Sequence, residues 1–332
     1  MAETDITFKK LLKEILDNGV EKTTRSGDVI STFGMSARFN IAKEFPILTL
    51  RRVFLRGIIT ELLWFLSGDT NIKPLVEQRV HIWTQDAYRY YYELLSKYTC
   101  NAERKKSILQ FTTAILNGEQ VIMTKPDGTE FTYTFGDLGP IYGKNWRHFG
   151  VNNVDQVADV INKLKTSPND RRMLITGYNP DDVSEAALPP CHLLYQFYTS
   201  PMTEEDKELW KETHEGKNET PSLKLSCSLY CRSQDFLLGT VFNWASASIM
   251  TAMIAETVGM GVGDLYWTGG DVHVYKNQLE AAEELLKREP ISCTPRLKIA
   301  NRGQGIDEYE VSDITVENYE ALPPIKIELS VG

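Results

Sequence analysis

The chain has 332 residues, of which 42% are hydrophobic and 24% are charged, values typical of a folded protein with one large core or two modest ones. Its formal net charge of −9 disfavours general binding to nucleic acid or to an anionic membrane, so an anionic substrate would need a local cluster of basic residues. The odd count of five cysteines is typical of reduced thiols. Neither an apolar signal core nor a run of about 20 apolar residues is found, so we expect a cytoplasmic protein without a membrane segment.

The first half of the chain begins with helical and extended patterns. Apolar residues recur at helical spacing in residues 8–16, and residues 53–66 predict a strongly apolar helix. Residues 29–41 favour a strand that follows a glycine turn. Beyond them we expect an amphipathic helix at 154–165 and apolar strands at 173–178 and 192–198.

The second half continues with a strand that has one buried face. Residues 222–230, SLKLSCSLY, alternate cleanly between apolar and polar positions, which indicates such a strand. Residues 243–259, rich in Ala, Ser and Met, predict a buried helix. The remaining expected elements are a more polar helix at 275–287 and short strands at 296–300, 308–316 and 325–330.

Two stretches look like insertions into one catalytic domain that spans residues 1–332. Residues 87–135 contain an aromatic helix and a hairpin, and residues 201–221 are almost wholly polar, as in an exposed excursion between two strands. No internal repeat, low-complexity tract or change of composition marks a domain boundary. We therefore predict one mixed domain with two insertions at its edge.

A cysteine and a histidine open one of the predicted strands. In the segment LPPCHLLYQFY (188–198), two prolines lead into Cys191 and His192. A lone cysteine is most often a buried structural residue, and the alternative is a nucleophile at the mouth of the strand. Adjacent strand residues point to opposite faces, so His192 is poorly placed to take the proton from Cys191. A nearby cation would have to lower the pKa of the thiol instead.

Four arginines at loop or strand-end positions suggest an anion site in this acidic protein. Arg232 follows the alternating strand and could serve both a phosphate and a thiolate, or could form an ordinary surface ion pair. Arg171 and Arg172 open another strand within PNDRR, and Arg25 sits in the glycine turn. Each arginine is weak evidence alone, and only the combination of the four points to an anion-binding site.

Other polar residues lie in segments that we predict to be buried or extended, where each could have a functional or a structural role. The amide of Asn243, near the start of a buried helix, could read the edge of a pyrimidine or merely cap the helix. His273 and Tyr275 lie two apart in an extended segment, where they could hold a sugar hydroxyl or belong to the core. Glu61 lies in an apolar helix, where burial would raise its pKa and suit it to proton transfer.

These residues lie in segments that resemble the thymidylate synthase family over most of the chain apart from the two insertions. The resemblance implies an α/β (α+β) fold of that type with a large mixed sheet covered by helices, a homodimer, and no metal. It also implies that dUMP and 5,10-methylenetetrahydrofolate are the substrates. The segments that carry it are ELLWFLSGDTN (61–71), GDLGPIYGKNWR (136–147), PNDRR (168–172), LPPCHLLYQFY (188–198), RSQDFLLG (232–239), TGGDVHVYKNQ (268–278) and ENYEALPPIKIELSV (317–331).

The resemblance also implies a mechanism and a set of site residues. Cys191 would add to C6 of uracil, and C5 would then attack the methylene of the folate. Arg171 and Arg172 would reach the phosphate of the other subunit's site. The implied catalytic residues are Cys191, Glu61, His192, Tyr142, Arg232 and Asn243; the implied dUMP contacts are Arg25, Arg171, Arg172, Arg232, Ser233, Asp235, Asn243, His273 and Tyr275; the implied folate contacts are Arg51, Trp83, Asp235 and Gly239.

Several positions depart from the family pattern on the expected folate side and near the C-terminus. Asp86 stands where a second tryptophan, three residues after Trp83, is usual, and Arg51 replaces a usual lysine. The nucleotide residues are unchanged. The other departures are Cys231 for Gln, Val241 for Pro, Trp244 for a small aliphatic residue, Ala247 for Tyr, Leu322-Pro323 for His-Pro, and Gly332 beyond the usual terminal valine.

The departures bear on how the reaction ends. Once the C5 proton has left, the covalent intermediate carries an exocyclic methylene, which hydride from tetrahydrofolate converts to dTMP and water converts to 5-hydroxymethyl-dUMP. Because hydride transfer needs a closed, dry site, the carboxylate of Asp86 favours the hydroxymethylase over a thymidylate synthase. A silent nucleotide-binding homologue and a cysteine hydrolase are further alternatives. The intact Cys191, Arg232, Asn243 and Glu61 argue against the first, and the lack of a suitably placed base argues against the second.

Overall fold

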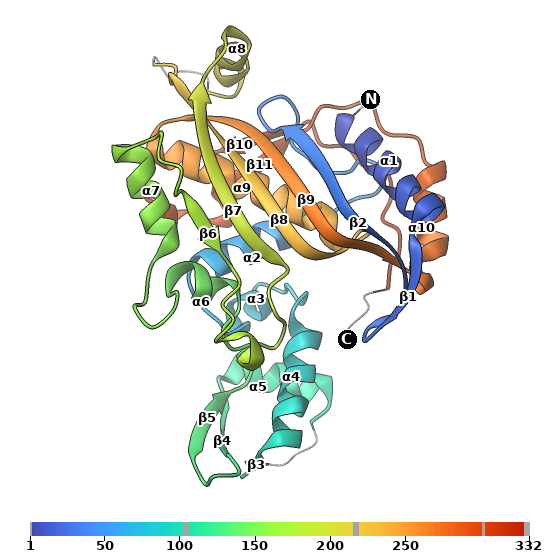
Figure 1. The fold of residues 1–332 in the computed structure, drawn as a ribbon, viewed down its shortest axis with the longest axis vertical. Helices are drawn as coiled ribbons and strands as arrows, with labels where there is room; N and C mark the ends of the chain where they lie inside the picture. The colour runs from blue at the N-terminus through green and yellow to red at the C-terminus, as the bar shows by residue number, and fades with distance from the viewer. Residues whose placement is uncertain (1, 102–105, 215–218, 301–302, 329–332) are drawn as a thin grey trace.

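A six-stranded mixed sheet forms the centre of the computed structural model, which describes residues 2–101, 106–214, 219–300 and 303–328 (Figure 1). The strand order is β1-β2-β9-β8-β7-β6, and only the pair β8–β9 is parallel. A parallel pair needs a long crossover, which here contains the helix α9. The predicted α/β class with a large mixed sheet and helices is therefore confirmed. The strands are β1 (Val20–Thr24), β2 (Gly27–Asn40), β6 (Leu174–Thr176), β7 (His192–Pro201), β8 (Leu223–Asp235) and β9 (Gly261–Tyr275).

The helix α9 (Gly239–Val258) is buried along most of its length. It lies behind the sheet in Figure 1, where it contacts β8 and β9 and also the helices α2 (Leu55–Leu66) and α7 (Gln156–Thr166). A helix covered on several sides has no polar face, which explains its Ala, Ser and Met content. The helices α1 (Glu3–Asn18) and α10 (Leu279–Lys287) pack against each other and against β9. None of the described helices is long and apolar enough to cross a membrane.

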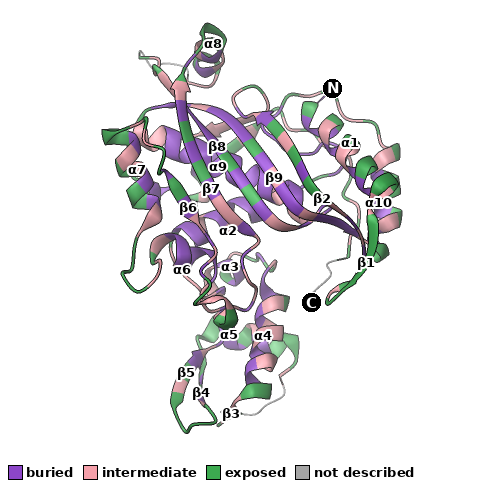
Figure 2. Cartoon of the chain, viewed as in Figure 1, coloured by how far each residue is buried: buried purple, intermediate pink, exposed green. Residues whose placement is uncertain are grey.

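The other face of the sheet carries exposed side chains in register. One row crosses five strands through Leu174, Gln196, Ser228, Tyr266 and Arg38, and all five residues are exposed. The neighbouring row points toward the helices and is buried. Figure 2 shows this contrast as alternating exposed and buried residues along the strands. Large apolar side chains also exposed on these strands are Phe33, Tyr198 and Tyr230.

A separate lobe extends from one end of the sheet (Figure 1). It contains the helices α4 (Thr84–Lys97) and α5 (Ile108–Asn117) and a three-stranded sheet. That sheet consists of β3 (Thr99–Cys100), β4 (Gln120–Thr124) and β5 (Glu130–Thr134). The remaining elements are α3 (Lys73–Glu77), α6 (Tyr142–Arg147), α8 (Glu204–Thr213), the hairpin-like pair β10 (Arg296–Ile299) and β11 (Ile314–Glu317), and the short 3₁₀ helices η1 (Val183–Glu185), η2 (Lys276–Gln278), η3 (Ile306–Glu308) and η4 (Val311–Asp313).

Several predicted boundaries are wrong. The strand β8 continues to Asp235 because its pairing with β9 continues, so Arg232 lies within a strand and not beyond it. The strand predicted at 308–316 covers only the last part of that range, because Glu308 and Asp313 bond nearby backbone amides and favour turns. The helix predicted at 275–287 begins later, because residues 275–278 end β9 and form η2. In the strand predicted at 325–330, residues 325–328 form no strand. Residues 329–330 and Gly332 lie outside the described residues.

The aromatic helix and the hairpin predicted within residues 87–135 are confirmed as α4 and the pair β4–β5, whereas the second predicted insertion has structure that its composition did not indicate. Position 87 falls inside α4, so the first segment does not begin at an element boundary. The polar segment 201–221 contains α8, whose Trp210 is buried and stacks on His214. The division of residues 1–332 into one domain with insertions at 87–135 and 201–221 stays a prediction.

Candidate active site

A cavity of about 340 Å³ lies where β7 begins, β8 ends and α9 begins. Its size suits a small organic ligand, for which pockets of roughly 300–1,000 Å³ are usual. Helices α2 and α4 supply a second wall. The predicted site residues that line the cavity are Glu61, Trp83, Tyr142, Cys191, His192, Ser233, Asp235, Gly239, Asn243 and Tyr275.

Cys191 is held at the mouth of β7 by Arg232 from the neighbouring strand. The Arg232 amide donates to the carbonyl of Cys191 at 2.9 Å. Its guanidinium donates to the carbonyls of Pro190 (Nε, 2.8 Å) and Pro189 (Nη2, 2.7 Å). Burial raises the pKa of the Cys191 thiol, and the charge of Arg232 opposes that effect. Arg232 is therefore the nearby cation that we expected to lower the pKa of the Cys191 thiol.

His192 does not act on the neighbouring thiol through either ring nitrogen. Its Nε2 contacts Asn243 Oδ1 at 2.6 Å, and its Nδ1 contacts the hydroxyl of Tyr195 at 3.3 Å. Burial lowers the pKa of His192 to about 4, so the ring is neutral near pH 7. An amide oxygen can only accept, so the proton is on Nε2, and Nδ1 accepts from Tyr195.

Asn243 is oriented by two neighbours and is not a helix cap. Its oxygen accepts from His192, and its Nδ2 donates to Gln234 Oε1 at 2.9 Å. The residue at the N-cap of α9 is Leu238, so the capping alternative is wrong. The second Nδ2 hydrogen faces Cys231 Sγ at 4.0 Å, a weak acceptor that a ligand oxygen can displace, and the amide oxygen keeps one further position at which it can accept.

Gln234 is a site residue that the sequence analysis missed. It is buried, it lines the cavity, and it fixes the amide of Asn243. Gly239 leaves room for it, because a Cβ at that position would lie 2.8 Å from Gln234 Nε2. The available signal was its place in the RSQD segment, two residues after Arg232.

Two carboxyl groups and a phenol complete the polar wall. Trp83 Nε1 donates to Glu61 Oε1 at 2.7 Å, and burial raises the pKa of Glu61 to about 7. Asp235 accepts from the amides of residues 237 and 238 and from Gln278 Nε2 at 3.1 Å. The Tyr142 hydroxyl accepts from the Cys191 amide at 2.7 Å, and burial raises its pKa well above the usual value, so the phenol keeps its proton. Burial also raises the pKa of Asp235, and a pKa of about 7 lets Glu61 change its charge near neutral pH.

Besides Arg232, three predicted residues lie outside the cavity lining. Arg25 is exposed in the turn between β1 and β2. Arg51 is buried and donates to the carbonyl of Leu237 at 2.7 Å. His273 pairs with Asp271 on β9, with 3.1 Å between Nδ1 and Oδ1. Their contacts with ligands stay predictions.

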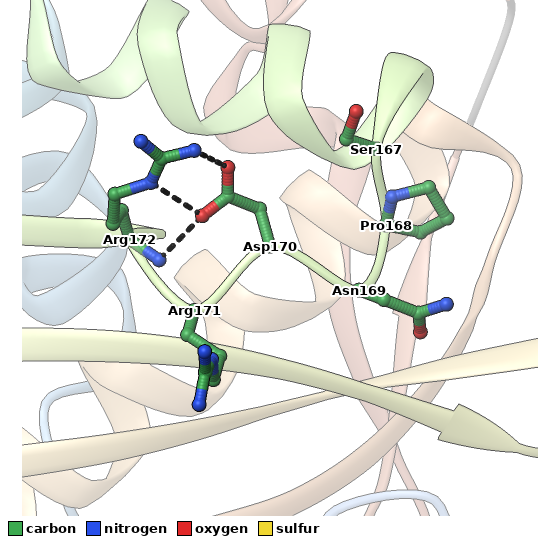
Figure 3. Close-up of a pocket in the computed structure, with 6 residues that line it drawn as sticks. All are labelled: Ser167, Pro168, Asn169, Asp170, Arg171 and Arg172. Carbon is green, nitrogen blue, oxygen red and sulfur yellow. Dashed lines mark hydrogen bonds and ion pairs between the residues drawn. The ribbon is translucent and has the colours of Figure 1, made fainter.

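The arginines of PNDRR also lie outside the cavity, in the loop between α7 and β6 (Figure 3). Arg172 folds back on Asp170 through two bonds, Nε to Oδ1 at 3.0 Å and Nη2 to Oδ2 at 2.7 Å. Arg171 points away from this pair and toward the strands. Both side chains are exposed, so within one chain they are separate from the cavity that contains Cys191.

Within the described residues, no group of three or more His, Cys, Asp or Glu side chains is placed to hold a metal ion.

Comparison with known proteins finds one family over almost the whole length. The family model described as thymidylate synthase matches residues 6–331. The thymidylate synthase of Listeria innocua serovar 6a is 38% identical over 343 residues, covering 98% of this chain and 99% of that protein. That of Zymomonas mobilis subsp. mobilis is 38% identical over 324 residues, covering 96% and 97%. That of Mycoplasma mobile is 38% identical over 329 residues, covering 98% and 99%.

The reactivity of Cys191 should depend on the charge of Arg232. In Arg232→Ala the attraction that stabilises the thiolate is lost, so the pKa of the thiol should rise. Each unit of increase reduces the thiolate fraction tenfold, so we expect iodoacetamide to label Cys191 about tenfold more slowly at mildly alkaline pH. Peptide mapping by mass spectrometry measures the rate at this residue. Arg232→Lys, which keeps the charge, is the control and should lose less; equal rates in wild type and Arg232→Ala would contradict the assignment.

Proposed function

We propose that this chain, which belongs to the thymidylate synthase family, converts dUMP to 5-hydroxymethyl-dUMP. Its membership of the family confirms the resemblance seen in the sequence. Membership also gives the coarser activity: the chain is a one-carbon transferase that acts on C5 of dUMP with 5,10-methylenetetrahydrofolate as co-substrate. The choice of water over hydride in the last step is our proposal.

In the proposed mechanism, the Cys191 thiolate adds to C6 of uracil, and the ring electrons move to form an enolate. C5 of that enolate attacks the methylene carbon of the folate. Loss of the C5 proton and departure of tetrahydrofolate leave an exocyclic methylene on the Cys191 adduct. The position of Cys191 in the cavity and the charge of Arg232 beside it support this role.

Recognition of the base falls to Asn243. With His192 and Gln234 holding one side of the amide, its remaining N–H would donate to uracil O4 and its oxygen would accept from N3–H. Cytosine offers the opposite pattern, so it would leave a buried group unpaired. Ser233 and Tyr275 line the same cavity and are further proposed nucleotide contacts. The set is completed by Arg25, Arg171, Arg172, Arg232, Asp235 and His273.

The folate would lie against Trp83, Asp235 and Gly239. Trp83 offers a ring, Asp235 offers a carboxylate fixed by backbone amides, and Gly239 offers backbone that a ligand can approach closely. Arg51 would act on the folate only through a rearrangement, because its guanidinium is buried against the carbonyl of Leu237.

The proposal that water, and not hydride, attacks the exocyclic methylene rests on the carboxylate of Asp86 in the cavity wall. Its side chain is 15% exposed and sits close enough to influence the pKa of Cys191. A carboxylate in that position attracts water to a site that hydride transfer requires to be dry. A thymidylate synthase that makes dTMP and dihydrofolate is the second candidate, because the named relatives carry that name.

We also propose a homodimer that buries the open face of the sheet. That face presents Phe33, Tyr198 and Tyr266, which are large apolar side chains exposed in a single chain. Arg171 and Arg172 lie next to Leu174 on the edge strand of the same face. A partner bound there would bring these arginines toward its own nucleotide phosphate.

The proposed setting is the cytoplasm, with small molecules and a second copy of the chain as partners. The net charge of −9 disfavours general binding to nucleic acid or to an anionic membrane. An anionic substrate would therefore be held by a local cluster of basic residues.

The product of dUMP and methylenetetrahydrofolate tests the proposed function. In water labelled with oxygen-18, we expect 5-hydroxymethyl-dUMP with the label in its hydroxyl, together with tetrahydrofolate. Mass spectrometry identifies both products. Cys191→Ala is the control and should bind dUMP without turnover. Stoichiometric dTMP and dihydrofolate would replace the proposal with the second candidate.

Complementation between inactive variants tests the dimer. Arg172→Ala and Cys191→Ala should each be inactive or nearly so, whereas a mixed dimer would contain one site with both wild-type residues. Random exchange should restore roughly a quarter of the wild-type activity, since half of the dimers are mixed and half of their sites are intact. Subunit exchange is verified by native mass spectrometry. If exchange occurs without recovery, Arg172 does not act across the interface.

A further inference from the structure

Asp86 lines the cavity that contains the nucleophile. It lies in the first turn of α4, three residues after Trp83, whose indole donates to Glu61. Its side chain is 15% exposed and lines the same cavity as Cys191 and Asn243. With Glu61 on α2 and Asp235 at the end of β8, it gives the cavity wall three carboxyl groups.

Asp86 has partners that favour its charged form. Arg89, one turn along α4, places Nη2 3.2 Å from Asp86 Oδ1 and is itself held by Glu93 and by the carbonyl of Ala187. Arg25 adds a further attraction, and a carboxylate in the first turn of a helix interacts favourably with the helix dipole. Burial raises the pKa of Asp86, and these groups oppose that effect.

The second oxygen of this carboxylate is available. Among the described residues, none donates a hydrogen bond to Asp86 Oδ2, whereas Oδ1 is held by Arg89. A carboxylate fixed at one oxygen by an arginine, with the other oxygen open, can orient a water molecule and accept its proton.

Glu61 is less suited to that task. Burial raises its pKa to about 7 and its Oε1 already accepts from Trp83, so it is partly protonated near neutral pH. His192 is excluded because Asn243 and Tyr195 engage both of its ring nitrogens. Asp235 has both oxygens occupied, Oδ1 by the amides of residues 237 and 238 and Oδ2 by Gln278 Nε2. Carboxyl groups whose surroundings differ in this way commonly divide the acid and base roles between them.

We infer that Asp86 is the residue that orients and deprotonates the water in the hydroxymethylation of dUMP. This inference rests on the proposed function. The water oxygen bonds to the exocyclic methylene carbon while one water proton passes to Asp86 Oδ2. The electron pair of the exocyclic double bond moves into the C5–C4–O4 enolate, which then forms the C5–C6 double bond and expels the Cys191 thiolate. No oxidant or reductant is needed, because the product and tetrahydrofolate account for all atoms.

Asp86→Asn tests this role, because the amide keeps the size of the side chain and an oxygen for Arg89. Two rates are measured in a single turnover: the release of tritium from C5 of labelled dUMP, which precedes the attack of water, and the formation of 5-hydroxymethyl-dUMP. We expect tritium release to keep its rate and product formation to fall about 100-fold, the usual scale for loss of a general base. Asp86→Glu, which restores a carboxylate, should recover part of the second rate.

Glu204→Gln is the matched control. It removes an exposed carboxylate from the first turn of another helix, where it pairs with Lys207, and it does not line the cavity, so both rates should stay at the wild-type value. If Asp86→Asn leaves product formation unchanged, or slows both steps equally, the inference is wrong while the proposed function stands. If the wild-type enzyme yields dTMP, the proposed function is wrong and this role of Asp86 falls with it.

Discussion

The position of Cys191 depends on Arg232. Two prolines precede the cysteine and have no amide proton, so this segment cannot join the sheet as a regular strand would. Arg232 compensates by donating its guanidinium to the carbonyls of Pro189 and Pro190 and its amide to the carbonyl of Cys191. The same cation opposes the rise in the thiol pKa that burial causes. Placement and reactivity of the thiol are therefore set by one residue of the neighbouring strand.

A hydrogen-bonded series extends from that strand to the helix behind the sheet. Tyr195 contacts His192, His192 donates to Asn243, and Asn243 donates to Gln234. Because α9 is packed against the sheet and against α2, the amide of Asn243 has little freedom to turn. Residues fixed in this way are ready to bind a flat polar edge without rearrangement, which lowers the cost of recognition.

Much of this arrangement could be predicted from the sequence, and what could not has physical reasons. Cys191 and Glu61 stood out because their residue types were unusual in their patterns, and both line the cavity. Gln234 did not, because a buried amide looks like any polar strand residue until its partner is known. Alternation ended the strand β8 too early, since pairing with β9 continues through polar positions. The arginines of PNDRR cannot be assigned from one chain, because they do not line the cavity that contains Cys191.

The proposed hydroxymethylation of dUMP requires that a carboxylate-lined cavity delivers water to the methylene of the covalent intermediate. The three carboxyl groups of the cavity have different partners: Glu61 is bonded to an indole, Asp86 to a guanidinium, and Asp235 to backbone amides and Gln278. The most direct measurement follows the hydrogen at C6 of the folate, which is the hydride that a methyl product would require. With methylenetetrahydrofolate deuterated at that carbon, we predict that the deuterium stays in tetrahydrofolate and that the nucleotide product contains none. Deuterium in a methyl group of the nucleotide would contradict the account.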